Sequence, residues 1–578
     1  MRRVLAALLV LATSGCAAIP TQTSPIPVNP SAGGATQAAA PEPTDDLDPL
    51  NLVRGFVNAS VNPDGDYAAA KAYLTPDAQK AWDTKAPPTI IETTFNTVPG
   101  EVETGQDPKK RAVSFNGKYV GRLETGDSSF QQQLGDFTVP VGVTRDDNGH
   151  WRISEPPVGI YMPLNGFNLN YRRVTLYFYS PDFSVLVPDP RYVVVPPSTS
   201  IPRRVTELLL KGPAANMRGA LATAIPNGAT QRKDTHEADD GALEVDLAKV
   251  GDLTAQVRKQ VVAQVVKSLA GVTSSRIKVL VEGAPISPDQ TEWRPADVQT
   301  GESLVTPDAD LSGLLVKDSS VRQLADGVPV KGPAGTAEYG VLSAAQSLDG
   351  AKLALVCRDG DRARLRVGGT EDDSLPFVDL PAVTMTRPSW LLSGRAGEPS
   401  TEVWTVVDGT KVVRVSKTDT GWSASAVNAT DLEKFGTITE LRLSRDGTRV
   451  AVVAGGTLVV AAVVRGQDST VALRAGRSLQ PSALATGTTT VDWLAQDVLV
   501  VGTSSPSYPV LKVNLDGLKV ERYNTSNLTV PIISVAAAPG RNVVAVDQSG
   551  IWSAGDIGDV WRSSAVIADR STSAFYPG

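Results

Sequence analysis

The C-terminal half of the chain carries turns and tryptophans that recur at a nearly regular spacing. These landmarks are the turns Asp349-Gly350, Asp446-Gly447 and Pro539-Gly540 and the side chains Trp390 and Trp493. Neighbouring landmarks are roughly 40–55 residues apart, which is the period of β-propeller blades, where a tight turn joins two strands of a four-stranded sheet. Residues 316–578 are therefore predicted to form an all-β propeller of about five to seven blades. A pair of β-sandwiches is the alternative.

A small α+β domain is predicted over residues 47–160. Asp48-Pro49 combines a helix N-cap with proline at the first helical position, and an apolar face follows that is made of Leu52, Val53, Phe56 and Val57. Helices come first, and strands are expected afterwards at 111–115, 118–123, 137–144 and 151–153. This order is similar to that of the small cone-shaped folds of the nuclear-transport-factor type, in which helices precede a curved sheet.

A second α+β domain is predicted over residues 171–283. Its first strand, Val174–Phe178, is followed by a helix that ends at Lys211-Gly212-Pro213, where glycine and then proline stop a helix. Val257, Val261, Val265 and Leu269 recur at i+4 along an amphipathic helix. Together with the turn Ala224–Gly228 and the strand Ile277–Glu282, these motifs resemble the GerMN domain, named from spore-germination proteins. Residues 284–315 contain four prolines and are expected to be a connector.

The N-terminus resembles a bacterial lipoprotein signal. Met1-Arg2-Arg3 precedes the nine apolar residues Val4–Ala12, a run far shorter than the ~20 residues that span a bilayer. Thr13-Ser14-Gly15-Cys16 resembles a lipobox, with Thr13 where Leu or Val is usual. Residues 1–15 are predicted to be a signal peptide that is cleaved between Gly15 and Cys16, after which Cys16 carries S-diacylglycerol and N-palmitoyl groups. An ordinary signal peptide with an accidental cysteine is the alternative. Residues 16–46, rich in Ala, Pro, Thr and Ser, would be the lipid anchor and a flexible linker.

Composition and cysteine usage exclude several classes of protein. Acidic residues outnumber basic ones by 62 to 55 and no long basic run occurs, which argues against a nucleic-acid partner. Cys16 and Cys357 are the two cysteines, so acylation of Cys16 leaves no disulfide. Cys357 ends the apolar stretch Leu353–Cys357 and is expected to be a small buried hydrophobic residue in a strand.

The search for catalytic, metal or cofactor sites predicts none. The chain has no nucleophile elbow, zinc-protease motif, phosphate-binding loop or C-x-x-C pair. Its two histidines, His150 and His236, are far apart in sequence and are expected in exposed loops, so a histidine-based triad or metal site is not predicted. The acidic clusters Asp239-Asp240 and Glu371–Asp373 lack the ligand spacing of a calcium loop and are expected to be solvated turns.

Aromatic side chains are the better candidates for recognition. A group of them surrounds the start of the GerMN-like domain: Tyr161, Phe167, Tyr171, Tyr177, Phe178 and Tyr179. Alternation along a strand sends at least half of these to the core. Trp552 and Trp561, near the C-terminus, are expected to pack within a blade. Any that face solvent would suit a sugar or protein contact.

The order of lipobox, tether, α+β domain, GerMN-like domain and propeller resembles the LpqB family of actinobacterial lipoproteins over almost the whole chain. The resemblance implies a protein held on the outer face of the cytoplasmic membrane. It also implies an accessory to the MtrA–MtrB two-component system that contacts the extracytoplasmic part of the sensor histidine kinase MtrB and influences cell-envelope homeostasis and division. No residue role beyond the lipidation of Cys16 is carried over, and no enzymatic activity is implied.

Two other functions stay open at this point. The first is a cell-wall protein that holds peptidoglycan or a precursor without contacting a kinase. The second is an envelope hydrolase, which would need two carboxylates about 5–10 Å apart in a cleft, an arrangement that leaves no local sequence signature.

The lipobox generates a direct test. Replacing Cys16 by Ala removes the sulfur that receives the lipid, so the protein is expected either to stay an uncleaved precursor or to leave the membrane fraction. Fractionation of cells, together with the mass of the N-terminal peptide, measures both outcomes. A Cys16→Ala protein that is still processed and membrane-held would contradict the lipoprotein assignment.

Overall fold

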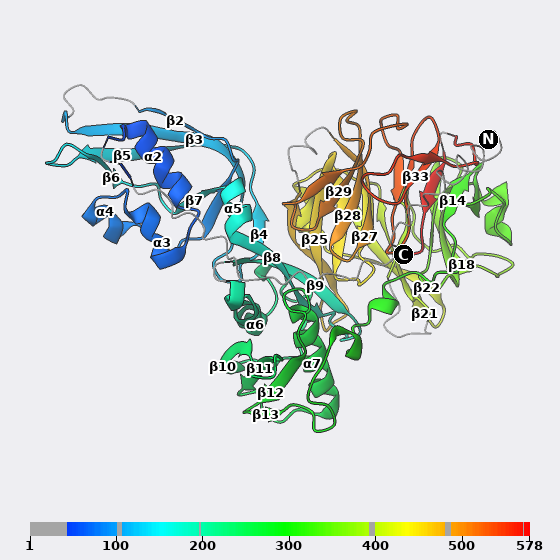
Figure 1. Ribbon diagram of the computed structural model, residues 1–578. Coiled ribbons are helices and arrows are strands. Elements are labelled where there is room, and N and C mark those ends of the chain that lie inside the picture. Colours follow the sequence, from blue (N-terminus) through cyan, green and yellow to red (C-terminus); the bar gives the residue numbers. More distant parts are fainter. Residues whose placement is uncertain are drawn as a thin grey trace, which may run out of the picture. The chain divides into compact units, whose positions relative to one another are not determined.

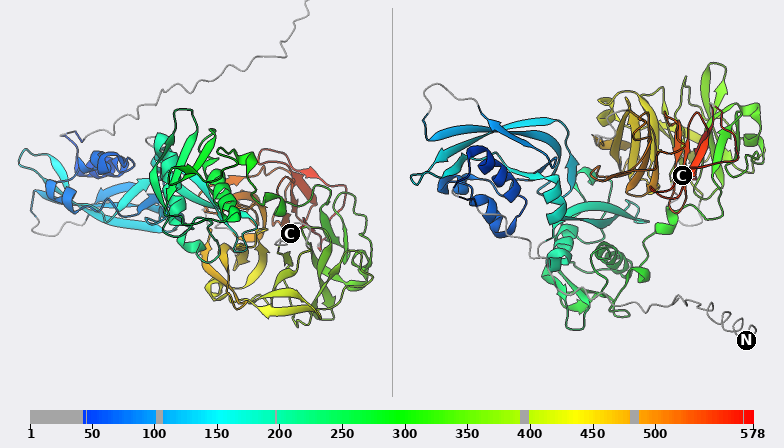
Figure 2. Two further views of the ribbon diagram at one scale, coloured as in Figure 1. Left: turned by 90° about the horizontal axis from the view of Figure 1, so that it is seen from below. Right: turned by 45° about the horizontal axis from the view of Figure 1, so that its top comes forward.

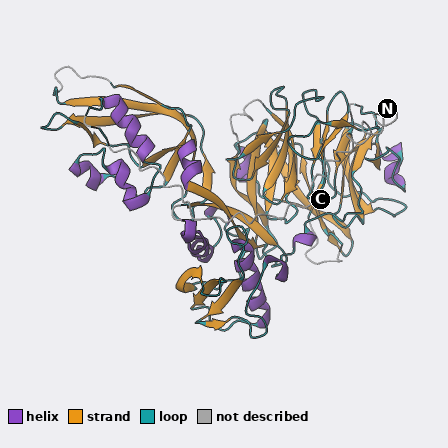
Figure 3. Ribbon diagram, in the orientation of Figure 1, coloured by secondary structure: helices purple, strands orange, loops and turns teal. Residues whose placement is uncertain are grey.

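The computed structural model describes residues 43–578 except 45, 101–106, 196–197, 392–398, 480–486 and 570. The predicted signal peptide, Cys16 and most of the linker lie outside the described residues. Helices concentrate in the part of the described chain that precedes the propeller, whereas the propeller consists mainly of strands (Figures 1 and 3). Within the described ranges, no helix has both the length and the apolar composition that a bilayer crossing requires.

The N-terminal domain begins with three helices, α2 (Pro49–Ala59), α3 (Asp64–Lys71) and α4 (Pro76–Ala81). Asp48 caps α2, because its Oδ1 accepts hydrogen bonds from the backbone N–H groups of Leu50 and Asn51 at 2.9 and 3.1 Å. The predicted apolar face of α2 is confirmed, since Leu52, Val53, Phe56 and Val57 are all buried. The apolar face therefore attaches the helix to the sheet that follows.

That sheet has the strand order β6-β5-β3-β1-β7, with β2 and β4 also paired to β3. The strands are β1 (Pro88–Ile91), β2 (Asn96–Pro99), β3 (Lys110–Leu123), β4 (Phe130–Gln132), β5 (Asp136–Arg145), β6 (Trp151–Glu155) and β7 (Ile160–Pro163). The prediction of two separate strands at 111–115 and 118–123 is wrong, because β3 is continuous. Gly117 stays extended opposite Phe137 of β5, and the pairing outweighs the tendency of Asn116-Gly117 to turn.

The GerMN-like domain follows the short helix α5 (Leu164–Asn170) and contains a long hairpin and a separate four-stranded sheet. The hairpin is β8 (Tyr171–Tyr179) with β9 (Leu186–Val194), and the sheet order is β10-β11-β12-β13. The remaining elements are α6 (Ile201–Lys211), β10 (Thr230–Glu237), β11 (Leu243–Ala248), α7 (Ala255–Leu269), β12 (Ile277–Val281) and β13 (Ala284–Pro285). Strands β11 and β12 are parallel, with α7 as the crossover between them.

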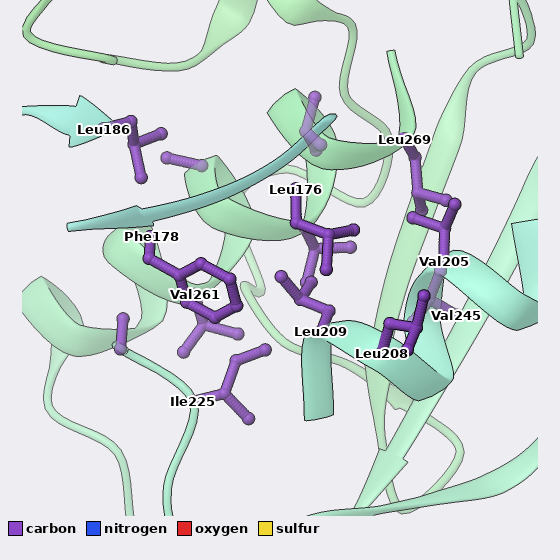
Figure 4. Packing of buried hydrophobic residues seen from close by; sticks show 14 of the residues in the cluster. Leu176, Phe178, Leu186, Val205, Leu208, Leu209, Ile225, Val245, Val261 and Leu269 are labelled. Carbon is purple, nitrogen blue, oxygen red and sulfur yellow. The ribbon is translucent and has the colours of Figure 1, made fainter. Parts of the chain in front are cut away.

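The core of this domain lies between the hairpin and the two helices. Leu176 and Phe178 of β8 share one buried cluster with Leu208 and Leu209 of α6 and with Val261 of α7 (Figure 4). Gly212 ends α6 at φ 85°, a conformation that glycine adopts without strain, so the predicted helix stop is confirmed.

Two expectations for this domain need correction. His236 was expected in a loop, but it lies on β10, where long-range pairing with β11 forms a strand from a polar stretch that has no hydrophobic alternation. The connector expected from residue 284 instead begins inside the sheet, because Ala284–Pro285 pairs with β12 as β13. Ile286 and Trp293 are also buried in the domain core.

The described residues from 314 onward form six sheets that succeed each other around a propeller, whose blades are seen in two further orientations in Figure 2. The first is β15-β14-β35, with β14 (Leu314–Lys317), β15 (Ser320–Gln323) and β35 (Ser573–Phe575). The second is β16 (Val341–Gln346), β17 (Lys352–Asp359) and β18 (Arg362–Gly369); the third is β19 (Ser389–Trp390), β20 (Glu402–Val407), β21 (Lys411–Thr418) and β22 (Gly421–Ala426). The fourth is β23 (Ile438–Leu443), β24 (Arg449–Ala454), β25 (Thr457–Arg465) and β26 (Val471–Ser478). The fifth is β27 (Thr488–Ala495), β28 (Val498–Thr503), β29 (Val510–Asn514) and β30 (Val520–Arg522); the sixth is β31 (Ser534–Ala536), β32 (Val543–Val546), β33 (Ile551–Ala554) and β34 (Arg562–Ser563).

The sequence landmarks have distinct structural roles in these blades. Gly350 and Gly447 have φ values of 73° and 70° in the turns that join the first two strands of their blades. Trp390 and Trp493 are buried, and the indole N–H of each donates to a carbonyl of the preceding blade, on Ala345 and Arg442 respectively, both at 3.1 Å. The tryptophans therefore join successive blades, which explains their spacing along the chain.

Strand β35 closes the ring by pairing with β14, which stands at the other end of the propeller sequence. Leu314, Leu315 and Val316 pair in antiparallel register with Phe575, Ala574 and Ser573. Phe575 is 1% exposed and packs with Leu314 and Val316 in one cluster. The first blade is thus assembled from both ends of the domain, which is why it lacks a landmark of its own.

Closure through β35 predicts a large effect at one position. Phe575→Ala should lower the opening free energy of the first blade by about 3–5 kcal/mol, since it leaves a cavity in a packed core. Ile567→Ala, at a side chain that is 82% exposed, is the control and should change it by less than about 0.5 kcal/mol. Hydrogen exchange of the amides in β14 measures both, and equal protection in the two variants would contradict the closing role of β35.

Candidate binding groove

Cys357, His150 and His236, which were considered for catalysis or metal binding, lie in separate elements of the fold. Cys357 is buried in β17, as predicted, and burial raises the pKa of its thiol to about 12, so little thiolate forms at neutral pH. His150 lies in a loop as expected but is half-buried, with Nδ1 3.6 Å from an Asp146 carboxylate oxygen. His236 is exposed on β10, and its Nδ1 is 2.8 Å from the carbonyl oxygen of Asp234.

Both acidic clusters are exposed, as predicted. Asp240 forms an ion pair with Lys278 at 2.5 Å, and Asp372 accepts a hydrogen bond from the backbone N–H of Gly369 at 2.7 Å. Within the described ranges, no three side chains of the His, Cys, Asp and Glu types gather closely enough to hold a metal ion. These carboxylates therefore stabilise turns and strand ends.

Most of the aromatic candidates are part of the packing. Phe167, Phe178 and Tyr179 are buried, and Tyr161, Tyr171 and Tyr177 are half-buried. Trp561 is 1% exposed and donates its indole N–H to the carbonyl of Asn524, which confirms its role within a blade. Trp552 is half-buried, with its indole N–H bonded to Asp547.

A groove of about 1130 Å³ opens beside this aromatic group, on the GerMN-like domain. One wall is the first half of α7, from Ala255 to Val262, and the other is the segment 287–304. Tyr179 and Phe183 from the β8–β9 hairpin and Trp293 line it as well. The Tyr179 hydroxyl donates to the carbonyl of Gln260 at 3.2 Å, which joins the aromatic end of the groove to the α7 wall. We call this site the α7 groove.

Sequence reasoning missed two aromatic residues of the α7 groove, the buried Trp293 and the exposed Phe183. Phe183 sits at the turn of the hairpin, 37% exposed, with its ring centroid 5.4 Å from that of Tyr179. Its φ of 58° is a left-handed conformation that costs a residue with a side chain roughly 1–2 kcal/mol. Such strain persists where the surroundings impose it, and it clusters at binding sites. Ser180 contributes here, because its hydroxyl and carbonyl accept from the N–H groups of Val185 and Phe183.

The segment opposite α7 is held close to the hairpin. Gly301 has a φ of 68°, and a Cβ there would lie 2.2 Å from the carbonyl oxygen of Ser184, so only glycine fits. The N–H of Leu186 donates to the carbonyl of Thr300 at 2.9 Å. The wall opposite α7 is therefore fixed to the hairpin by a main-chain hydrogen bond.

Charge is divided between these walls. Arg258 and Lys259 stand exposed on α7, and neither side chain has an ion-pair or hydrogen-bond partner among the described residues. Asp289, Asp297 and Glu302 lie on the other wall. Glu302 is paired with Lys267 at 3.1 Å, and Asp297 accepts from the backbone N–H of Arg294 at 2.7 Å. The α7 wall therefore offers unpaired positive charge.

The hairpin that carries Phe183 is bound to the propeller by charges that are half-buried or buried. Arg173 of β8 donates to Asp497 at 2.8 Å and to Asp516 at 3.0 Å, and the Tyr192 hydroxyl donates to Asp516 at 3.0 Å. Burial by itself lowers the pKa of Arg173, but the two carboxylates outweigh it and raise that pKa. Arg449 of the propeller donates to the carbonyl of Pro188 at 2.8 Å. These contacts fix the hairpin relative to the blades.

A second charged cluster lies among the inner strands of the propeller. Burial lowers the pKa of Arg442 to about 10, and Arg387 adds to the shift. Burial alone would raise the pKa of Asp492, but Arg442, Arg387 and Arg445 outweigh it and lower that pKa. Arg445 also donates to the carbonyls of Trp493 and Ala537, on or beside the inner strands of two later blades. The cluster thus links blades at their inner edges.

Comparison with known proteins gives one consistent assignment. The chain matches family models described as "Lipoprotein LpqB, N-terminal domain" over residues 42–168, "Sporulation and spore germination" over 175–287 and "Lipoprotein LpqB beta-propeller domain" over 313–577. It is 31% identical to Lipoprotein LpqB of Rhodococcus jostii, covering 93% of this chain and 91% of that one. It is 30% identical to Lipoprotein LpqB of Mycolicibacterium smegmatis, covering 95% of each. Among solved structures, the tandem GerMN domains of the sporulation protein GerM from Bacillus subtilis align at 18% identity and a TM-score of 0.18, covering 23% of this chain and 48% of that one.

The two neighbouring phenylalanines should respond differently to substitution. Phe178→Ala removes a ring that is 0% exposed and should cost about 3–5 kcal/mol of local stability. Phe183→Asn should change it by less than about 1 kcal/mol, because Asn tolerates the left-handed backbone and the relief of strain offsets the lost ring contact. Hydrogen exchange of the α7 amides measures both. A loss of local stability in Phe183→Asn as large as that in Phe178→Ala would show that Phe183 belongs to the core.

Proposed function

This chain belongs to the LpqB family of lipoproteins, and on that premise we propose that it is an extracytoplasmic, lipid-anchored modulator of a sensor histidine kinase of the MtrB type. In this role it contacts the extracytoplasmic part of the kinase and so affects cell-envelope homeostasis and division. It acts by binding rather than by catalysis.

The observation that carries this proposal is the likeness to LpqB lipoproteins along the full length of the chain. The N-terminal, GerMN-like and propeller domains match in the same order and together span most of residues 42–577. The relatives are matched over 91–95% of their own length, so no large domain of theirs is missing here. A role that needs all three domains is therefore available to this chain.

The predicted lipid on Cys16 gives a physical reason for the proposal, because it would hold the protein at the membrane that contains the kinase. Confinement to the membrane raises the effective concentration of the protein near a membrane receptor without any new contact, by roughly 10²–10⁴-fold in apparent affinity. A single acyl chain gives only marginal membrane binding, so the several chains of a mature lipoprotein are needed.

The test reconstitutes the full-length lipidated chain and the full-length kinase in the same liposomes. We expect the chain to crosslink to the extracytoplasmic part of the kinase and to change its autophosphorylation rate. The matched control is the Cys16→Ala chain without residues 1–15, added in solution, which should need roughly a hundredfold higher concentration for the same effect. Unchanged autophosphorylation together with no crosslink at high micromolar concentration would overturn the proposal.

A further inference from the structure

We propose that the α7 groove binds a carboxylate-bearing glycan. This inference goes beyond the proposed kinase contact and does not rest on it. It rests on three features of the groove: its hydrogen-bonding side chains, its exposed aromatic ring and the division of charge between its walls.

The hydrogen-bonding groups of the α7 groove match sugar hydroxyls. Four glutamines, three serines and one threonine line it. Amides and hydroxyls of this kind both donate and accept hydrogen bonds, as a sugar hydroxyl does. Binding sites usually combine a few such groups with aromatic surface, and a volume of about 1130 Å³ accommodates several sugar rings.

Phe183 supplies the flat apolar surface. The face of an aromatic ring is negative, and the C–H groups on one side of a sugar ring carry partial positive charge, so the two attract. Phe183 stands at the surface on a left-handed backbone, whereas the nearby Phe178 and Tyr179 are buried. A ring that contributes little to the core is thus maintained beside the groove.

The charges on the two walls favour glycans that carry carboxylates over neutral ones. Arg258 and Lys259 have no partner among the described residues and lie near the N-terminus of α7, where the helix dipole also favours negative charge. They suit a ligand carboxylate. Asp289 and Asp297 on the other wall suit hydroxyl or amide N–H donors. A glycan of N-acylated amino sugars that carries carboxylates has both kinds of group.

An extended peptide fits the α7 groove less well. Peptides commonly bind by pairing with a free strand edge or by placing an apolar helix face in an apolar groove. The strand residue in the lining, Tyr179, already pairs through its main chain with Leu186 of β9 and with Ala222. Most of the lining side chains are polar. A glycan is therefore the occupant to which the geometry points.

The experiment measures binding of three probes to the full-length chain in detergent by calorimetry at low salt. The first probe is a peptide-free peptidoglycan glycan strand with free lactyl carboxylates, the second is a neutral N-acetylglucosamine hexamer, and the third is a free stem peptide. We expect the carboxylated glycan to bind about tenfold or more tightly than the neutral hexamer, because charge-assisted hydrogen bonds add to the stacking. The stem peptide should bind most weakly.

Substitutions in the α7 groove test whether the glycan binds there. Arg258→Ala with Lys259→Ala should reduce affinity for the carboxylated glycan to about that of the neutral hexamer, and Phe183→Asn should weaken both sugars by about 3–10-fold. The matched control is Lys211→Ala with Lys233→Ala, which removes the same charge from exposed positions of the same domain outside the groove. It should leave both affinities unchanged.

Three results would overturn the inference. The carboxylated glycan could fail to bind at millimolar concentration, the free peptide could bind as tightly as the glycan, or the control pair could weaken binding as much as the groove pair. The last result would mean that net charge, and not the groove, attracts the ligand.

Discussion

The pairing of β14 with β35 is the contact on which the rest of the propeller depends. A blade is stable only when its faces are covered by neighbours, so an open ring would expose one face of the first blade and one of the last. Pairing of Leu314–Val316 with Ser573–Phe575 joins the two ends of the ring, and Leu315 of the first blade then packs in one cluster with Val544 of the sixth. Arg387, from a later blade, strengthens the closure by donating to the carbonyl of Ala574 at 3.1 Å.

The closed ring in turn holds the GerMN-like hairpin. Asp497 and Asp516 lie in turns between strands of the fifth blade, and both accept from Arg173. Buried ion pairs of this kind add little net stability, because desolvation offsets their attraction, but breaking one leaves an unpaired buried charge. Their contribution is therefore to specify one arrangement of the hairpin and the propeller. The same hairpin carries Phe183 at its turn, so the aromatic end of the α7 groove is fixed by contacts that begin in the propeller.

A kinase contact and a wall ligand are compatible in one molecule. A ligand changes the affinity for a partner only if it binds two states of the protein differently. The segment 287–304 offers a physical connection, because Leu304 and Val305 pack against Leu348 of the propeller while the same segment forms one wall of the α7 groove. A glycan in the groove would thus touch a segment that also contacts the blades.

The sequence alone determined those features that arise from interactions within a few residues of the chain. The cap at Asp48, the stop at Gly212 and the turns at Gly350 and Gly447 follow from side-chain or glycine geometry, and burial of Cys357 follows from the apolar stretch around it. The family resemblance gave the order of the domains. Only the tertiary structure decided the features that need contacts between distant residues. These are the six-sheet closure through β35, the strand at His236 and the continuity of β3 across Gly117. Each depends on hydrogen bonds or packing between segments whose proximity no local pattern records.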